Sequence, residues 1–199
     1  MRAQVLTEAV IGQDTLLQKA ALVLGGTMFI ALAAQVAVPF YPVPVTLQTL
    51  AILIVGLTFG SRLGAVTLVA YLAEGAMGLP VFAQGMNGVA LVGPTAGFLF
   101  GFVAMAWLAG LVVEKGLARG VVSTAVCGIA ISALLYVPGV AWPMALAEVA
   151  GMSGKWVGSS ADVIWTYWVA PFLLGDAVKA VIAAMVVWGG WKAIAARKG

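Results

Sequence analysis

The sequence predicts an all-α integral membrane protein with six transmembrane helices. Of the 199 residues, 63% are hydrophobic and only 9% are charged. Charged residues make up about 25% of a typical soluble domain, so the excess apolar surface is expected to face lipid. In addition, no charged residue lies between Lys19 and Arg62. That stretch is long enough for two membrane spans of roughly 20 residues each.

Charged, glycine-rich or proline-rich segments separate the hydrophobic stretches and define the expected elements. The second and third helices are short and should be tilted or shielded by their neighbours. Pro171 lies inside the last stretch, where it should kink the helix or mark its true start. The prediction is a cytoplasmic segment over 1–19, a single membrane domain over 20–192, a basic cytoplasmic tail over 193–199, and helices over 20–38, 46–59, 62–73, 95–113, 120–137 and 164–192.

The connections between these helices alternate in length. Those at 60–62 and 114–119 are brief, whereas 39–45, 74–94 and 138–163 are longer or richer in Gly and Pro. Because Lys and Arg accumulate on the cytoplasmic side, both termini are predicted to be cytoplasmic and the long connections to face outward. The brief side carries Arg2, Lys19, Arg62, Lys115, Arg119, Lys192, Arg197 and Lys198, and the other side carries Lys155.

Several function classes are excluded by composition. The sequence has no His and one Cys, Cys127, which we interpret as a small buried hydrophobe. Disulfides within the chain, Cys/His zinc sites and Ser-His or Cys-His nucleophiles are therefore excluded. An intramembrane aspartyl protease would need two catalytic Asp, but only Asp176 lies clearly inside a predicted span. The prediction is that the chain is not an enzyme and binds and moves a small solute.

Two binding motifs are missing from the sequence, and their absence argues against nucleotide and nucleic-acid binding by this chain. It contains no ATP-binding loop of the GxxxxGK(S/T) type, so nucleotide-driven work would require other chains. It contains no basic run with interleaved aromatic residues, which argues against nucleic-acid binding.

Asp176 and Lys179 form an acid–base pair inside the last predicted span. Their i, i+3 spacing places them on one helix face within ion-pairing reach. A charge at the bilayer centre costs at least ~2.5–3.5 kcal/mol on insertion scales, so it persists only when paired or solvated. Two interpretations stay open. The pair could simply neutralise itself and tie helices together, or Asp176 could accept N–H donors of a ligand while Lys179 attracts a carboxylate.

Aromatic residues precede this pair on the same face. Trp165, Trp168 and Phe172 continue the spacing of three and four residues, which is typical of one helical stripe. Such a wall would suit the apolar part of an amphipathic ligand, although packing at the membrane interface or in the core is the alternative. Helix rise places Lys179 roughly 20 Å from the inner boundary marked by Lys192. The site is therefore predicted to open toward the outer leaflet.

Two outward connections contain polar residues that a solute could contact. Segment 38–48 is stiffened by three prolines. Segment 74–95 is too apolar for an exposed loop and too rich in Gly and Pro for a helix, so we expect it to pack back over a cavity. Loop geometry or local capping is the alternative for each single residue. The candidate contacts are Tyr41, Thr46, Gln48, Glu74, Gln84 and Asn87.

Five short blocks in fixed order resemble one family. They are VPFYPVPVTLQTL (38–50), GSRLGA (60–65), LPVF (79–82), GPTAGFL (93–99) and GDAVK (175–179). Together they resemble the BioY family, the biotin-specific substrate-binding subunits of energy-coupling factor (ECF) transporters. The resemblance extends over about 20–192.

This resemblance implies six helices and a vitamin site near the outer face, under the first and third outer loops. It also implies a bacterial inner-membrane location, biotin as the transported substrate, no resident cofactor, and an energising module of a transmembrane coupling protein and two ATPase subunits. There is no Arg over 75–113, so Lys179 would carry more of the ligand's charge. The expected biotin contacts are Asp176, Lys179, Asn87, Gln48, Tyr41, Glu74, Trp168 and Phe172.

One rival function is left open by these observations. The chain could be a stand-alone secondary transporter or facilitator for biotin or another small vitamin-like carboxylate. The absence of a recognisable inverted repeat in the sequence argues against that function. Uptake that survives removal of the ATPase partners would favour it.

Overall fold

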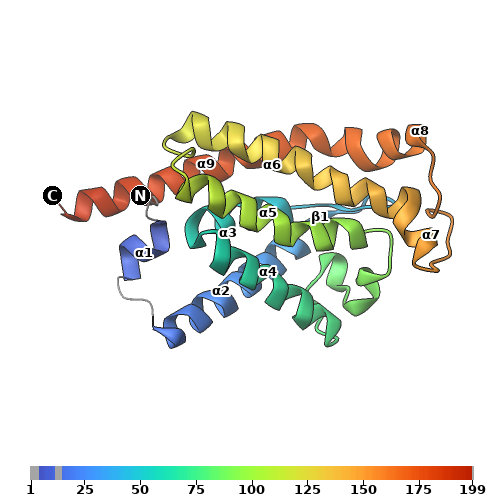
Figure 1. Cartoon of the computed structure of the whole chain (residues 1–199), viewed down its shortest axis with the longest axis horizontal. Coiled ribbons are helices and arrows are strands. Elements are labelled where there is room, and N and C mark those ends of the chain that lie inside the picture. Colours follow the sequence, from blue (N-terminus) through green and yellow to red (C-terminus); the bar gives the residue numbers. More distant parts are fainter. Residues whose placement is uncertain (1–4, 12–14, 199) are drawn as a thin grey trace.

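The computed structural model describes residues 5–11 and 15–198. Within those residues the chain is a bundle of helices with one short antiparallel hairpin (Figure 1). The hairpin pairs Ala37 with Thr46 and Val38 with Val45. The elements are α1 (Leu6–Ile11), α2 (Leu16–Gln35), β1 (Ala37–Val38), β2 (Val45–Thr46), α3 (Gln48–Phe59), α4 (Ser61–Ala76), the 3-10 turns η1 (Ala83–Gly85) and η2 (Gly88–Leu91), α5 (Ala96–Glu114), α6 (Val121–Ala141), the π turn η3 (Trp142–Leu146), α7 (Ala147–Val149), α8 (Ala161–Ile164), the π turn η4 (Trp165–Val169) and α9 (Ala170–Lys198).

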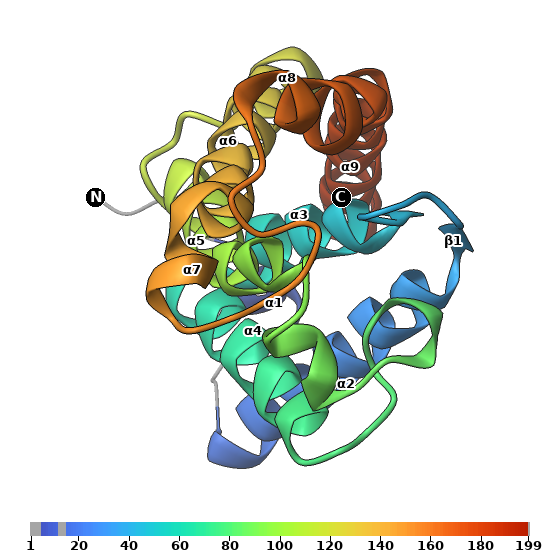
Figure 2. The ribbon, with the colours of Figure 1, turned by 90° about the vertical axis from the view of Figure 1, so that its right-hand side faces the viewer.

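Helices α3 and α5 occupy the middle of the bundle. On one side of them lie α6 and α9, and on the other lie α2 and α4, as Figure 2 shows along the bundle. The contacts agree with this view, because α5 packs against α3, α4 and α6, while α9 packs against α6 and α3. The core is therefore built from helices distant in sequence, and α3 and α9 become direct neighbours.

Four helical stretches in the described part of the chain are long and apolar enough to cross a membrane. They are Leu16–Gln35, Ala96–Glu114, Val121–Val149 and Ala161–Arg197, as expected for a multi-pass membrane protein. The shorter α3 has 12 residues, and 8 of them are buried. Its neighbours therefore shield it, in line with the expectation for a short second helix.

The first long helix begins and ends earlier than predicted. The Thr15 side chain accepts a hydrogen bond from the backbone N–H of Gln18, and the Gln18 side chain accepts one from the Thr15 N–H. This capping box begins the helix at Leu16. The helix ends at Gln35 rather than 38 because Val38 precedes a proline and takes the extended conformation of β1. Helix α1 within the segment 1–19 was not predicted.

The helix predicted over 120–137 continues well beyond Pro138. It passes through η3 and ends at Val149, so a large part of the predicted connection 138–163 is helical. Proline removes one backbone donor, but a neighbouring helix and a local π turn can satisfy the freed groups in a membrane helix. Gly97 of α5 packs closely against this part of α6, since a Cβ there would meet the Pro138 carbonyl. Cys127 on α6 is partly exposed, not fully buried as expected.

The last helix also differs at both ends. It begins at Ala161, after an extended Ser160, and contains the π turn η4 just before Pro171. The perturbation expected from the proline is thus a local widening of the helix. Helix α9 then runs to Lys198, so the described part of the predicted tail 193–199 is helical.

The brief connections gather at one end of the bundle. The Glu114 carboxylate at the end of α5 accepts hydrogen bonds from the Ser61 N–H at 2.7 Å and from its hydroxyl, so the α3–α4 and α5–α6 turns adjoin. Backbones approach closely here, because a Cβ on Gly110 would meet Gly60 and Ser61. Small residues permit such approach in membrane helices. Arg2, one of the basic residues assigned to this side, lies outside the described residues.

Candidate functional site

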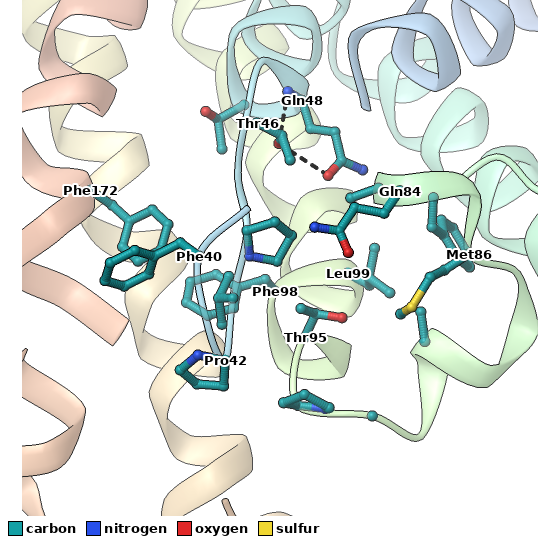
Figure 3. Close-up of a pocket in the computed structure, with 18 of the residues that line it drawn as sticks. Phe40, Pro42, Thr46, Gln48, Gln84, Met86, Thr95, Phe98, Leu99 and Phe172 are labelled. Carbon is teal, nitrogen blue, oxygen red and sulfur yellow. Dashed lines mark hydrogen bonds between the residues drawn. The ribbon is translucent and has the colours of Figure 1, made fainter. Parts of the chain in front are cut away.

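A cavity with a volume of about 390 Å³ lies at the opposite end, among the hairpin, the 82–95 segment and α3, α5, α6 and α9 (Figure 3). This is within the range of roughly 300–1,000 Å³ typical of small-molecule sites. Most of the lining is apolar or aromatic, and the polar side chains are few. The lining residues are Phe40, Tyr41, Pro42, Val43, Pro44, Thr46, Gln48, Thr49, Phe82, Ala83, Gln84, Met86, Val89, Ala90, Gly93, Pro94, Thr95, Phe98, Leu99, Phe102, Leu135, Tyr136, Phe172, Asp176 and Lys179.

Asp176 and Lys179 meet at the buried end of this cavity. The Lys179 Nζ lies 3.0 Å from Oδ1 of Asp176, which is the contact that their i, i+3 spacing predicts. The two residues are only 7% and 8% exposed. Burying them as a hydrogen-bonded pair limits the cost of removing both charges from water, whereas removing one partner would leave the other uncompensated.

Two hydroxyl groups that sequence reasoning missed complete this pair. Tyr136 of α6 donates to Oδ2 of Asp176 at 2.6 Å, and Thr49 of α3 donates to Oδ1 at 3.1 Å. Lys179 in turn donates to the Thr49 hydroxyl at 3.1 Å. The network therefore joins α3, α6 and α9. A polar side chain in an apolar helix does signal that a partner is needed, but the partner's identity depends on how the helices pack.

The network leaves hydrogen-bonding capacity for a bound molecule. The Lys179 ammonium has three N–H donors, of which Asp176 and Thr49 accept two. The Asp176 carboxylate has about four acceptor positions, and Lys179, Thr49 and Tyr136 use three. One donor and one acceptor thus remain side by side. Because the two charged groups are only 3.0 Å apart, a single polar group of a small molecule can reach both.

The predicted aromatic stripe divides between three environments. Phe172 lines the cavity and makes an edge-to-face contact with Phe40 of the hairpin, with ring centroids 6.0 Å apart. Trp168 is 1% exposed but packs outside the cavity lining. Trp165 is 58% exposed and lines a separate apolar depression between α6 and η4. A π turn inserts an extra residue into the helix. Trp165 and Trp168 therefore do not lie on the same helix face, as regular α-helical spacing would have placed them.

Gln48 lies in the cavity wall but is held by the protein. Its Nε2 donates to the Tyr71 hydroxyl at 2.8 Å, and its Oε1 accepts from Thr46 at 3.2 Å. Tyr71 then donates to the carbonyl of Val81 at 2.8 Å. This chain of hydrogen bonds ties the first turn of α3 to Val81, which immediately precedes the 82–95 segment. Gln48 therefore contributes to the shape of the cavity as well as to its surface.

The remaining sequence-based candidates occupy different positions. Tyr41 lines the cavity and is 73% exposed, so it lies at the open end. Asn87 lies outside the lining and its side chain accepts from the Val89 N–H at 3.4 Å, which caps η2. Glu74, in the last turn of α4, also lies outside the lining. For Asn87 the structure therefore shows local capping, which the sequence analysis gave as the alternative to a ligand contact.

The segment that includes Gln84 is anchored to α2. The Gln35 Nε2 donates to the Phe82 carbonyl at 3.0 Å, and its Oε1 accepts from the Gly85 N–H at 3.0 Å. The residues that line the cavity come from 40–46 and 82–95 among the long connections. The segment 138–163, which the structure describes throughout, contributes none. The loops at the cavity are thus the first two long connections, in which the sequence analysis placed its candidate contacts.

A family model identifies the chain. The model described as "BioY family" matches residues 3–196, which is nearly the whole sequence. The chain belongs to the BioY family. Four of the five sequence blocks that resembled this family include cavity residues, at Phe40, Phe82, Thr95 and Asp176, so most of the family resemblance maps to the cavity.

Curated relatives cover most of the chain. A protein of Rhodobacter capsulatus named biotin transporter BioY is 37% identical over 80% of this chain and 85% of its own length. A Rhizobium etli protein of the same name is 34% identical over 79% of this chain and 82% of its own length. Among solved structures, the S-component for biotin from an ECF-type ABC transporter has a TM-score of 0.61 at 21% identity, covering 94% of this chain and 96% of that one. This last likeness establishes the fold.

Proposed function

We propose that this member of the BioY family is the biotin-binding S subunit of an ECF-type ABC transporter and mediates biotin uptake. The observation that carries the proposal is the buried Asp176–Lys179 pair at the closed end of the cavity. The names of the relatives from Rhodobacter capsulatus and Rhizobium etli support biotin as the substrate.

The geometry of the pair favours one orientation of biotin. The ureido ring has N–H donors and a carbonyl acceptor at the same end of the molecule, which suits one acceptor and one donor side by side. We therefore assign the ureido group to both Asp176 and Lys179. The sequence-based assignment gave the carboxylate to Lys179, but an extended biotin cannot place its two opposite ends at groups 3.0 Å apart.

The other proposed contacts follow from position in the cavity. Phe172 and Phe40 would pack against the thioether ring, since they form an apolar wall near the pair. Tyr41 and Gln48 would contact biotin directly because both line the cavity. We propose indirect roles for three residues outside the lining, as packing or loop support: Trp168, Glu74 and Asn87.

The proposal extends to topology and partners. Six helices would cross the bacterial inner membrane with both termini in the cytoplasm and the cavity open to the outside. Supporting this, Arg62, Lys115 and Arg119 belong to the brief connections that adjoin at one end. Cysteines placed at Ala118 and Ser159 in a Cys127→Ala background test the orientation with an impermeant reagent, because both positions are partly exposed. Labelling at Ser159 from outside is expected, and labelling at Ala118 from outside would contradict the topology.

The partners would be a transmembrane coupling protein and two ATPase subunits, with no resident cofactor. The deciding experiment uses the full chain purified in detergent and then reconstituted in liposomes. Calorimetric titration should detect saturable biotin binding, and mass spectrometry should detect biotin that co-purifies. Liposomes with this chain alone should not accumulate biotin, whereas addition of the coupling module and ATP should permit uptake. Accumulation driven by a proton or sodium gradient would instead favour a secondary transporter.

A further inference from the structure

The charge of the cavity lining is balanced within the buried pair. Among the described lining residues, Lys179 is the only Lys or Arg and Asp176 is the only acidic residue. Their 3.0 Å contact means that each compensates the other. The described lining therefore offers no cation whose charge is available to a ligand's carboxylate.

The two ends of the cavity differ in exposure. Asp176 and Lys179 lie at the buried end, whereas Tyr41 and Gln84 lie at the exposed end. A ligand that places its polar head on the pair must therefore extend its other end toward solvent. A carboxylate there keeps much of its water, so it neither requires a protein cation nor loses much by lacking one.

Neutral groups are available at this exposed end. Gln84 has a backbone φ of 61°, and its amide extends over the cavity toward Thr95 (Figure 3). The turn that holds it is fixed by the Gln35 hydrogen bonds to Phe82 and Gly85. An amide and a hydroxyl can each donate to or accept from a ligand. They can therefore serve a carboxylate or a neutral carboxamide equally.

We propose that the site is strict for the ureido head and permissive for the tail, so that its ligands include biotin derivatives whose carboxyl group is an amide or ester. This inference rests on the proposed function, because it takes the biotin head to occupy the pair. It adds a substrate class, neutral and amide-linked biotin conjugates. It follows from the balanced charge of the lining and from the exposed position of Gln84.

The test compares a change at each end of the ligand, using calorimetric titration of the purified full chain. Biotinamide, which lacks the negative charge, should bind within about threefold of biotin, as expected for a solvent-exposed charge. With 2-iminobiotin, a cationic guanidine replaces the urea beside Lys179, and affinity should fall by at least about tenfold. If biotin binds and biotinamide binds more than tenfold weaker, the inference is wrong while the proposed function stands. If biotin itself does not bind, the proposed function is wrong.

A charge introduced at the tail end tests the position of the carboxylate. Gln84→Lys should raise the affinity for biotin relative to that for biotinamide by roughly two- to fivefold, the usual range for an exposed ion pair. Gln84→Glu should instead favour biotinamide over biotin. Ser153→Lys is the matched control, because Ser153 is exposed and outside the cavity lining, and it should leave the ratio unchanged. An equal change of ratio in Gln84→Lys and Ser153→Lys would overturn the assignment of the tail to Gln84.

Discussion

Helix α3 is joined to its neighbours differently at the two ends of this bundle. At the end with the brief connections, backbones touch directly: Gly110 packs on the Gly60–Ser61 turn, and Gly56 packs on Ala106. At the cavity end, α3 is joined to α9 and α6 through side chains, because Thr49 and Tyr136 both donate hydrogen bonds to Asp176. Glycine and alanine leave no space between α3 and α5, whereas the longer polar side chains hold α3, α6 and α9 apart around the cavity. One bundle thus combines a tightly packed end with an open one.

The largest expected effect is at the cavity end. Removing one member of the pair by Lys179→Met should destabilise the protein by ~3–5 kcal/mol, because Asp176 remains as an uncompensated buried charge. Binding of biotin should also weaken by one to two decades, as expected for loss of a charge-assisted hydrogen bond of about 1.5–3 kcal/mol. Thermal melting and calorimetric titration in detergent measure the two effects.

The double variant Asp176→Asn with Lys179→Met separates a ligand site from a structural strut. Neutral replacement of both partners should recover much of the stability and leave biotin unbound. If a well-folded Lys179→Met protein bound biotin with wild-type affinity, the ligand would lie elsewhere and the cavity end would have only a structural role for this pair.

The next largest effect is at the packed end. Gly110→Ala should destabilise the protein by about 1–3 kcal/mol, since the added Cβ overlaps the backbone of Gly60 and Ser61. Gly25→Ala in α2 is the matched control, because no atom lies within 4 Å of its added Cβ. Alanine there should stabilise the helix by up to about 1 kcal/mol.

Thermal melting compares the two glycine variants, and titration of the folded protein should give a biotin affinity within about twofold of wild type for both. Equal melting temperatures would show that close backbone approach does not distinguish the packed end. A large loss of affinity in Gly110→Ala would show that the two ends are coupled.

The smallest expected effect concerns a single hydroxyl group. Tyr136→Phe removes the donor at 2.6 Å from Asp176 and keeps the ring, so biotin affinity should fall by roughly five- to tenfold, equivalent to about 1–1.5 kcal/mol. Tyr167→Phe is the control, because Tyr167 is exposed and outside the lining of this cavity. An unchanged affinity in Tyr136→Phe would show that the carboxylate is positioned without α6.

Much of the membrane fold could be predicted because it depends on local properties. Long apolar stretches predicted the helices close to α3, α4 and α5, and the i, i+3 spacing of Asp176 and Lys179 predicted their ion pair. Boundaries near proline were less accurate: Pro138 suggested a helix end, yet the helix continues to Val149. Whether a proline ends a helix depends on the structure around it. Here the π turn η3 follows Pro138 and α5 packs closely against it, and neither feature is evident from the local sequence.

Composition, spacing and short motifs were enough to predict a helical membrane protein that resembles the BioY family and has a paired charge in its last span. The groups that surround that pair could be found only from the packing of the helices. Thr49 and Tyr136 reach Asp176 from helices 127 and 40 residues away in the chain, and Trp165 leaves the aromatic stripe through a π turn. Spacing along one helix is set by backbone geometry, whereas contacts between helices are set by packing.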